Sequence, residues 1–180
     1  RGAAMGTGTE VDWEIIHGNN PTLPLESLQR MMDAKLRQLE PLKYTADELA
    51  WAATIRESLG DDAPELAEAA QIEDYAVLTG YGSTDVGDVS RAVPTVSVRT
   101  ATWVPGTAAH SWQAVAASGH SYGAKGTQHA AKAMMLAAVE LYTNPQLREA
   151  AKAEFIAARG EDYVYESLLG DRAPPLDYRK

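Results

Sequence analysis

Hydrophobic residues repeat every second position in parts of the chain, and this period is typical of a β-strand with one buried face. Val11, Trp13 and Ile15 alternate with acidic residues, and Val96 and Val98 alternate with polar ones. A third, short apolar run at residues 75–79 is compatible with a strand as well. The predicted strands cover residues 10–16 (EVDWEII), 75–79 (YAVLT) and 95–103 (TVSVRTATW).

Other stretches carry hydrophobic residues at a spacing of three or four, which predicts helices. Thr45 and Glu48 are three residues apart, as in a capping box that starts a helix. Asn144 precedes Pro145, a pair that favours a helix start at the proline. The predicted helical regions are a helix end within 1–8, then 25–39, 45–59, a short helix from about Ser83, 123–143, and 145–159.

The order of these elements predicts the fold class. A strand, a hydroxyl-rich turn, a helix and a second strand follow one another between residues 75 and 103, which is typical of an α/β protein. The chain has 180 residues, of which 45% are hydrophobic, enough for a domain with a core of its own. We therefore expect an α/β domain whose last third is helical.

Composition narrows the classes of partner and site. The formal net charge of −9 argues against a nucleic-acid partner, because such proteins present a basic face. The chain has no cysteine, so thiolate chemistry and disulfides are excluded. No apolar run reaches the roughly 20 residues that a membrane span needs, and no signal sequence is recognisable, so we expect a cytoplasmic protein. The chain begins at Arg1 rather than at a methionine, as a segment of a longer polypeptide would.

Two stretches are candidates for chemistry. Residues 82–95 (GSTDVGDVSRAVPT) combine glycine, hydroxyls and two carboxylates, Asp85 and Asp88, three residues apart. This pattern fits a helix start, with Ser83 or Thr84 as its cap, and it also fits part of an active site. His110 follows a predicted strand and a run of small residues, a place where α/β proteins bind ligands. We interpret His17, His120 and His129 as ordinary structural or surface histidines.

A series of motifs resembles one enzyme family. In this order and spacing, they are similar to the carboxy-terminal part of M20-family metallopeptidases and amidohydrolases, and the resemblance extends over nearly the whole chain. One departure is Ala124, where a histidine would be expected in the most similar branch. The motifs are GSTDVGDVS (82–90), VPT (93–95), ATW (101–103), GTAAHSWQ (106–113) and KGTQHAAKAM (125–134).

The resemblance implies a two-domain architecture. In that family a mixed-sheet α/β catalytic domain holds two metal ions, and a smaller lid domain, which often forms the dimer, is inserted into it. On this pattern residues 1–18 would be the last helix end and strand of the lid, and residues 19–180 the carboxy-terminal portion of the catalytic domain.

The resemblance also implies a site. His110 would be a ligand to one of two divalent ions, zinc or manganese, through a neutral ring nitrogen. Asp85 would position a ligand or the loops of the site, and Gly82, Ser83 and Thr84 would frame the substrate. The family's other ligands and its general base precede this segment, so the chain by itself should bind no metal and be inactive.

The implied reaction is hydrolysis of an amide in N-acyl or N-aroyl amino acids such as aminobenzoyl-glutamate, by a metal-activated water. The implied partners are a small-molecule amide substrate, the upstream part of the same polypeptide, and a homo-oligomeric or paired subunit. The alternative is a non-catalytic α/β module for binding or oligomerisation that retains the scaffold.

Overall fold

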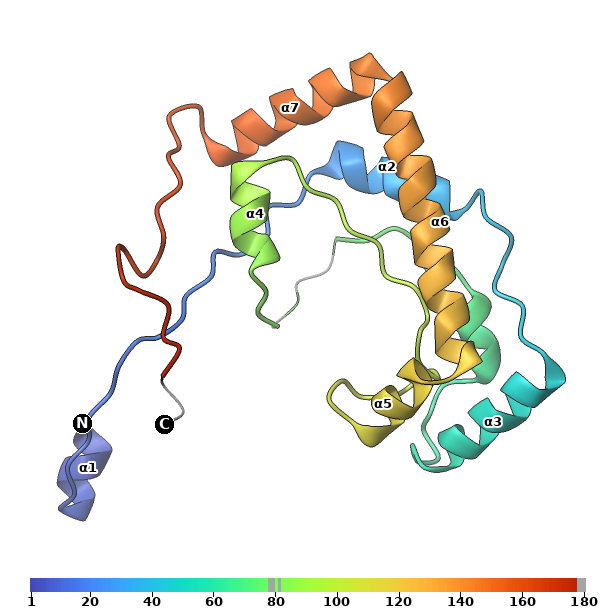
Figure 1. Cartoon of the computed structure of the whole chain (residues 1–180), viewed down its shortest axis with the longest axis horizontal. Helices are drawn as coiled ribbons and strands as arrows, with labels where there is room; N and C mark the ends of the chain where they lie inside the picture. Colours follow the sequence, from blue (N-terminus) through green and yellow to red (C-terminus); the bar gives the residue numbers. More distant parts are fainter. Residues whose placement is uncertain (78–79, 81, 178–180) are drawn as a thin grey trace.

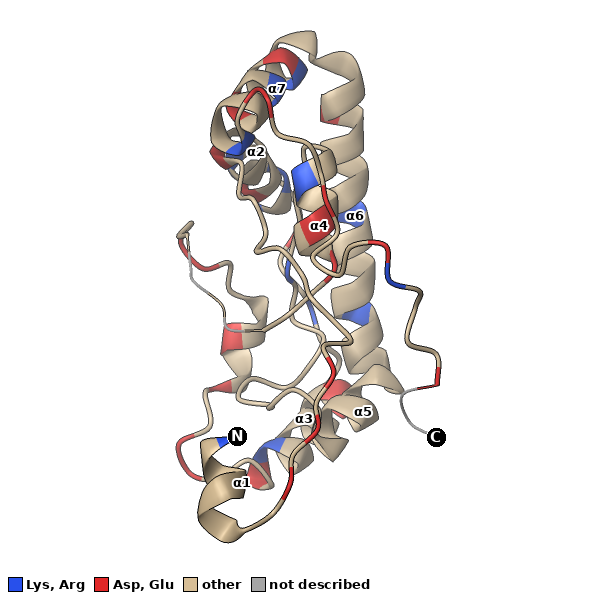
Figure 2. Ribbon diagram, turned by 90° about the vertical axis from the view of Figure 1, so that its left-hand side faces the viewer, with Lys and Arg blue, Asp and Glu red and all other residues tan. Residues whose placement is uncertain are grey.

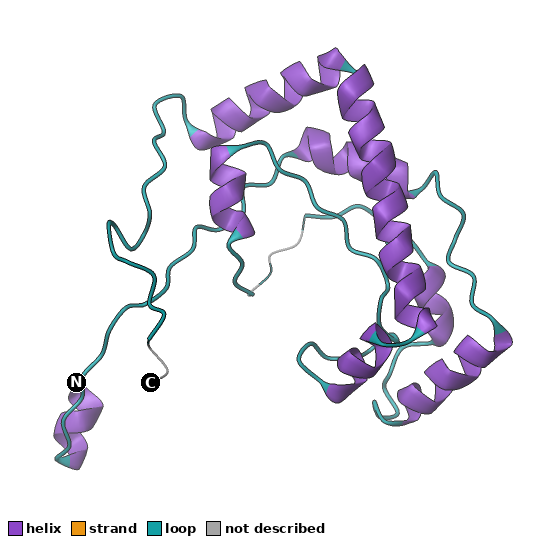
Figure 3. Ribbon diagram, viewed as in Figure 1, coloured by secondary structure: helices purple, strands orange, loops and turns teal. Residues whose placement is uncertain are grey.

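The computed structural model describes residues 1–77, 80 and 82–177, and this part of the chain is built from helices and loops (Figure 3). The long helix α6 joins a group formed by α2 and α7 at one end to a group formed by α3 and α5 at the other (Figure 1). The elements are α1 (Gly2–Thr7), α2 (Glu26–Leu36), α3 (Ala46–Glu57), the 3-10 helix η1 (Leu66–Ala70), α4 (Val86–Ala92), α5 (Trp112–Ser118), α6 (Ser121–Thr143) and α7 (Pro145–Arg159).

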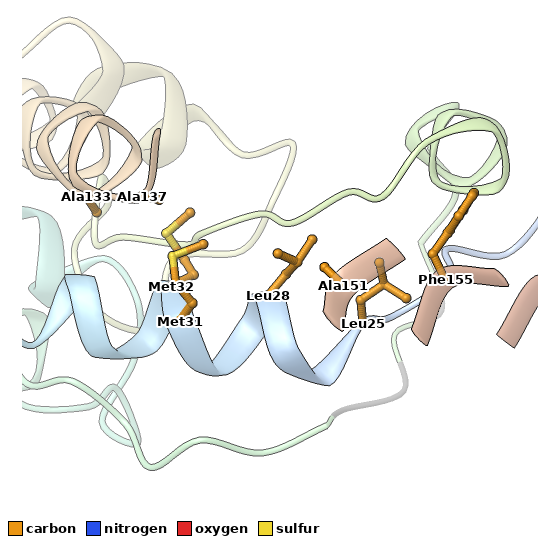
Figure 4. Close-up of a cluster of buried hydrophobic side chains, with 8 residues drawn as sticks. All are labelled: Leu25, Leu28, Met31, Met32, Ala133, Ala137, Ala151 and Phe155. Atoms are coloured by element: carbon orange, nitrogen blue, oxygen red, sulfur yellow. The ribbon is translucent and has the colours of Figure 1, made fainter. Parts of the chain in front are cut away.

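One hydrophobic core lies between α2, α6 and α7. The apolar positions of α2 fall on one side of the helix because they are three or four residues apart. Figure 4 shows them directed toward alanines of α6 and toward α7. The small alanines let α6 approach α2 closely, and Phe155 closes the end near Leu25. The buried members are Leu25, Leu28, Met31, Met32, Ala133, Ala137, Ala151 and Phe155.

A second core lies at the other end of α6. Tyr122 is fully buried there, and Val104 contributes from the segment that precedes α5. Ala52 and Ile55 come from α3, and Ala69 comes from η1. This cluster holds the start of α6 against α3 and thereby fixes the position of the loop that carries His110.

Glycines in α6 allow an extended segment to cross the helix. A Cβ added at Gly126 would lie 2.0 Å from the carbonyl oxygen of Ala101, and one at Gly123 would lie 2.8 Å from that of Thr102. The Thr100 hydroxyl donates a hydrogen bond of 2.9 Å to the carbonyl of Gly126. Residues 100–102 therefore lie directly against the backbone of α6. This contact directs the following residues toward the turn before α5.

The expected α/β fold is wrong. The described residues contain no strand, so the sheet predicted from residues 10–16, 75–77 and 95–103 does not form; residues 78 and 79 of the second predicted strand lie outside the described residues. Period-two alternation indicates which side chains share a face, but a strand also needs a neighbouring strand to receive its backbone hydrogen bonds. Val11, Trp13 and Ile15 are 50%, 63% and 61% exposed, while Val96 and Val98 pack on the α2–α6–α7 core as an extended connection.

The helix predictions are confirmed, with bounds shifted by a few residues. The capping box of Thr45 and Glu48 forms at the start of α3, and Asn144 caps α7 through its side chain. The helix end expected within residues 1–8 is α1, which ends at Gly8 in the left-handed region (φ 67°). Two short elements, η1 and α5, were not predicted, because neither has enough residues to show a helical period.

A segment after α7 contacts the segment before α2, away from the helical groups (Figure 1). Arg172 donates to the Glu14 carboxylate and to the carbonyl of Ile15, and Leu168 lies close to Gly18. Every residue of α1 is at least partly exposed. None of the helices in the described ranges combines the length and hydrophobicity that a membrane span requires.

Candidate functional site

The candidate acid Asp85 stands at the start of α4. It occupies the N-cap position, and the Thr84 hydroxyl next to it accepts a hydrogen bond of 3.3 Å from the Val86 amide. Gly82, Ser83, Thr84 and Asp85 are all exposed. The first half of the motif therefore presents a carboxylate and two hydroxyls to solvent from a short turn.

The second half of the same motif is built into the fold. Gly87 is buried, and a Cβ there would lie 1.8 Å from the carbonyl oxygen of Asn20. The Asp88 carboxylate accepts from the backbone and side-chain amides of Asn20, at 3.1 Å and 2.6 Å. The buried Ser90 hydroxyl accepts from the Leu23 amide at 2.8 Å and donates to the Gly87 carbonyl at 2.6 Å. These bonds attach α4 to the segment that leads into α2.

His110 lies in the turn that precedes α5. Its side chain is exposed, and its φ of 62° is in the left-handed region, which a residue with a Cβ seldom adopts. Ser111 follows as the N-cap of α5: its hydroxyl accepts from the Ala114 amide at 3.2 Å and donates to the Ala108 carbonyl at 2.7 Å. The cap fixes the turn and leaves the imidazole directed outward.

Asp85 and His110 come from different elements, and no hydrogen bond or ion pair joins them within the described part of the chain. In the same ranges, no three His, Asp or Glu side chains gather in a group that could hold a metal ion. Structural zinc sites have four protein ligands and catalytic sites three, so further ligands would have to join His110 to complete such a site.

Two of the other histidines have structural environments, as expected. The Nδ1 atom of His120 accepts a hydrogen bond of 3.1 Å from the Tyr122 amide, so this ring caps α6. The same ring stacks on Trp51 with a centroid distance of 4.0 Å. His129 is partly buried on α6, and this burial, together with the charge of Lys132, lowers the pKa of its imidazole.

A buried ion pair joins α3 to α6, and sequence reasoning did not identify it. Lys125 donates to the Glu48 carboxylate and, at 2.8 Å, to the carbonyl of Lys43, while the Thr45 amide donates to Glu48 at 2.7 Å. The bonds that Glu48 accepts, above all that from Lys125, lower the pKa of its carboxyl group to about 2. The capping box marked Glu48 as a residue of a helix start. No pattern in the sequence indicates its ion pair with Lys125, which is 77 residues away.

Aromatic rings cover this ion pair. Tyr44 stacks on Tyr122 with a centroid distance of 4.2 Å, and the Lys125 ammonium lies 5.7 Å from the centre of the Tyr44 ring. Burial raises the pKa of both phenols. The cluster is thus a neutralised, packed contact between helices, and its charges are already matched.

A cavity of about 540 Å³ lies between α2, α6 and residues 71–76 and 97–101. Two of its polar lining residues have side-chain partners: Tyr75 donates to Gln29, also in the lining, at 3.2 Å, and Asp33 pairs at 3.0 Å with Arg37, which does not line the cavity. His129 also lines it. Neither Asp85 nor His110 does, so the cavity and the predicted site are separate.

Comparison with known proteins finds one similarity of note. The chain is 27% identical over 178 residues to a p-aminobenzoyl-glutamate hydrolase subunit of Escherichia coli (strain K12), and the match covers 85% of this chain and 37% of that protein. No protein-family model matches the chain, and no solved structure matches it. The chain thus spans little more than a third of the length of this curated relative. The similarity supports a relation to an amidohydrolase; the narrower M20 assignment stays a prediction.

Proposed function

We propose that this chain is part of a metal-dependent amidohydrolase that cleaves the amide bond of N-acyl or N-aroyl amino acids, of the aminobenzoyl-glutamate type. The observation that carries the proposal is the 27% identity to a hydrolase subunit over 85% of the chain. The relative is named as a subunit, which supports a paired subunit here too, with a homo-oligomer as the other proposed assembly. Residues 1–18 would belong to a lid domain and 19–180 to the catalytic domain, without the sheet that the sequence suggested.

His110 is the residue proposed to bind one of two divalent ions, zinc or manganese. Holding a histidine in the left-handed region costs on the order of 1 kcal/mol, and such strain is concentrated at functional sites. The exposed ring is free to donate a neutral nitrogen to an ion. Since the described residues bring no further ligands to it, the remaining ligands would come from other polypeptide.

Asp85 and the turn before it would serve the same site without contacting the metal. The exposed carboxylate of Asp85 would orient a ligand or a loop, and Gly82, Ser83 and Thr84 would face the small amide substrate. Asp88 is not available for this role, because its carboxylate already binds Asn20.

The test compares histidine variants in the complete protein that contains this chain. His110→Ala should lower kcat/KM for aminobenzoyl-glutamate at least about a hundredfold and reduce bound metal, because a ligand is lost. His17→Ala is the matched control, since His17 is also an exposed loop histidine, and it should leave both quantities unchanged. Wild-type turnover in the His110 variant, or stoichiometric zinc bound by this chain alone, would contradict the proposal. A complete protein that hydrolyses none of these amides would favour a non-catalytic binding or oligomerisation module.

A further inference from the structure

The C-terminal half of helix α6 is apolar on its outer side as well as on the side that faces the cores. The inner side is buried through Tyr122, Gly126, Ala133 and Ala137. Over residues 131–142 the outer side repeats apolar residues at spacings of three or four, and Met135 and Tyr142 are 67% and 87% exposed. We define the outer stripe as Ala131, Met135, Ala138, Val139 and Tyr142.

The outer stripe also has little charge. Of the charged residues of α6, Lys125 binds Glu48 and Glu140 binds Lys35, both away from the stripe, while Lys132 flanks it. Figure 2 shows how few charged positions α6 carries compared with α2 and α7. A helix that is apolar all round is typical of a buried helix with packing partners on both sides.

The total exposed surface area of the chain indicates how large a partner of α6 would be. The chain exposes 12872 Å². A compact monomer of 19.4 kDa exposes about 8,500 Å², so this chain exposes roughly 4,000 Å² more than a closed globule would. A dimer interface of standard size removes only about 800 Å² from each partner. A second copy seated on one face would thus leave most of the excess exposed.

The exposed apolar residues are also spread over several elements, which again argues for a partner of domain size. Besides the outer stripe, they occur before α2, on α4, on α5 and after α7. They include Val11, Trp13, Ile15, Val86, Val89, Val93, Trp112, Val115, Val164 and Leu168.

We propose that the outer stripe of α6 is the docking surface for a further folded layer of the same hydrolase, contributed by polypeptide equivalent to the part of the Escherichia coli relative that this chain does not match. This inference rests on the proposed function. The partner layer presents uncharged apolar side chains, and the alanines of the stripe let its backbone come close to α6.

The experiment co-expresses this chain with the unmatched part of the Escherichia coli relative as a separate polypeptide. Light scattering should show a one-to-one complex, and hydrogen exchange of the amides of residues 131–142 should slow at least tenfold relative to the chain alone. The double variant Met135→Glu and Ala138→Glu should weaken the complex at least tenfold. Met5→Glu is the control, because Met5 is 83% exposed on α1, and it should bind as the wild type does.

Three results would overturn the inference: a chain that stays alone, a complex that the double variant forms equally well, or slowed exchange on α6 caused by self-association. Since both substituted side chains are exposed, thermal unfolding of the double variant should match that of the wild type and so exclude misfolding. Hydrolysis is assayed separately. A complex that does not hydrolyse the amides would refute the proposed function and support the docking surface. Hydrolysis without slowed hydrogen exchange on α6 would support the function and refute the docking surface.

Discussion

The two halves of the motif GSTDVGDVS have the same kinds of residue and opposite environments. In residues 82–85 the hydroxyls and the carboxylate face solvent. In residues 87–90 the glycine accommodates a crossing backbone, and the carboxylate and hydroxyl satisfy buried amides. The comparison teaches that residue type alone does not distinguish a structural polar group from one that is free for chemistry. The distinction is whether a partner from a distant segment, such as Asn20 or Leu23, lies within hydrogen-bond distance.

The largest expected effect comes from Gly87, in the second half of the motif. Gly87→Ala should destabilise the protein by at least about 3 kcal/mol, because its Cβ would lie 1.8 Å from the Asn20 carbonyl and backbone cannot yield easily. Gly82→Ala is the matched control. A Cβ there meets open space as far as the described residues extend, so its effect should stay within about 0.5 kcal/mol. Urea unfolding measures both, and equal stabilities would show that α4 does not pack on residues 20–23.

A smaller effect is expected when a buried carboxylate loses its partner. Lys125→Ala should cost about 2 kcal/mol, because it leaves Glu48 buried without its cation. The pKa of Glu48 is lowered from its ordinary 4.5 to about 2 in the folded protein. Its contribution is therefore complete above about pH 4.5 and is lost as pH falls toward 2.

Thermal unfolding between pH 6 and pH 2.5 tests the sign of this effect. The wild type should lose more stability over this range than Glu48→Gln, whose side chain does not titrate. Glu40→Gln provides the control, since its pair with Lys43 is on the surface and contributes little. Parallel pH curves for the wild type and Glu48→Gln would contradict the buried pair.

The smallest effect is expected at His110, and its sign matters more than its size. His110→Gly should stabilise the chain by up to about 1 kcal/mol, because glycine adopts a φ of 62° without strain. Calorimetry of the isolated chain measures it, with His17→Gly as a comparison that should not stabilise. A clear loss of stability at His110 would mean that the ring supports the fold, as the ring of His120 does by capping α6.

Sequence reasoning located the helices because their signals are local. A capping box, an Asn-Pro start and an apolar repeat act within one or two turns, and the structure confirms each of them. The strands were mispredicted because pairing depends on a second segment that the alternation does not specify. Asp85 and His110 could be nominated from their neighbours and from a resemblance, whereas Asp88 could not be recognised as structural until Asn20 lay beside it.

The amino-acid sequence by itself determined where the longer helices lie, to within a few residues at their ends, because those choices are settled by neighbouring residues. Only the tertiary structure decided which polar groups are neutralised, since Glu48 and Lys125, or Asp88 and Asn20, meet across 77 and 68 positions. It also decided that one side of α6 is buried and the other exposed. Both sides are apolar, and packing against α2 and α3 was available to only one of them.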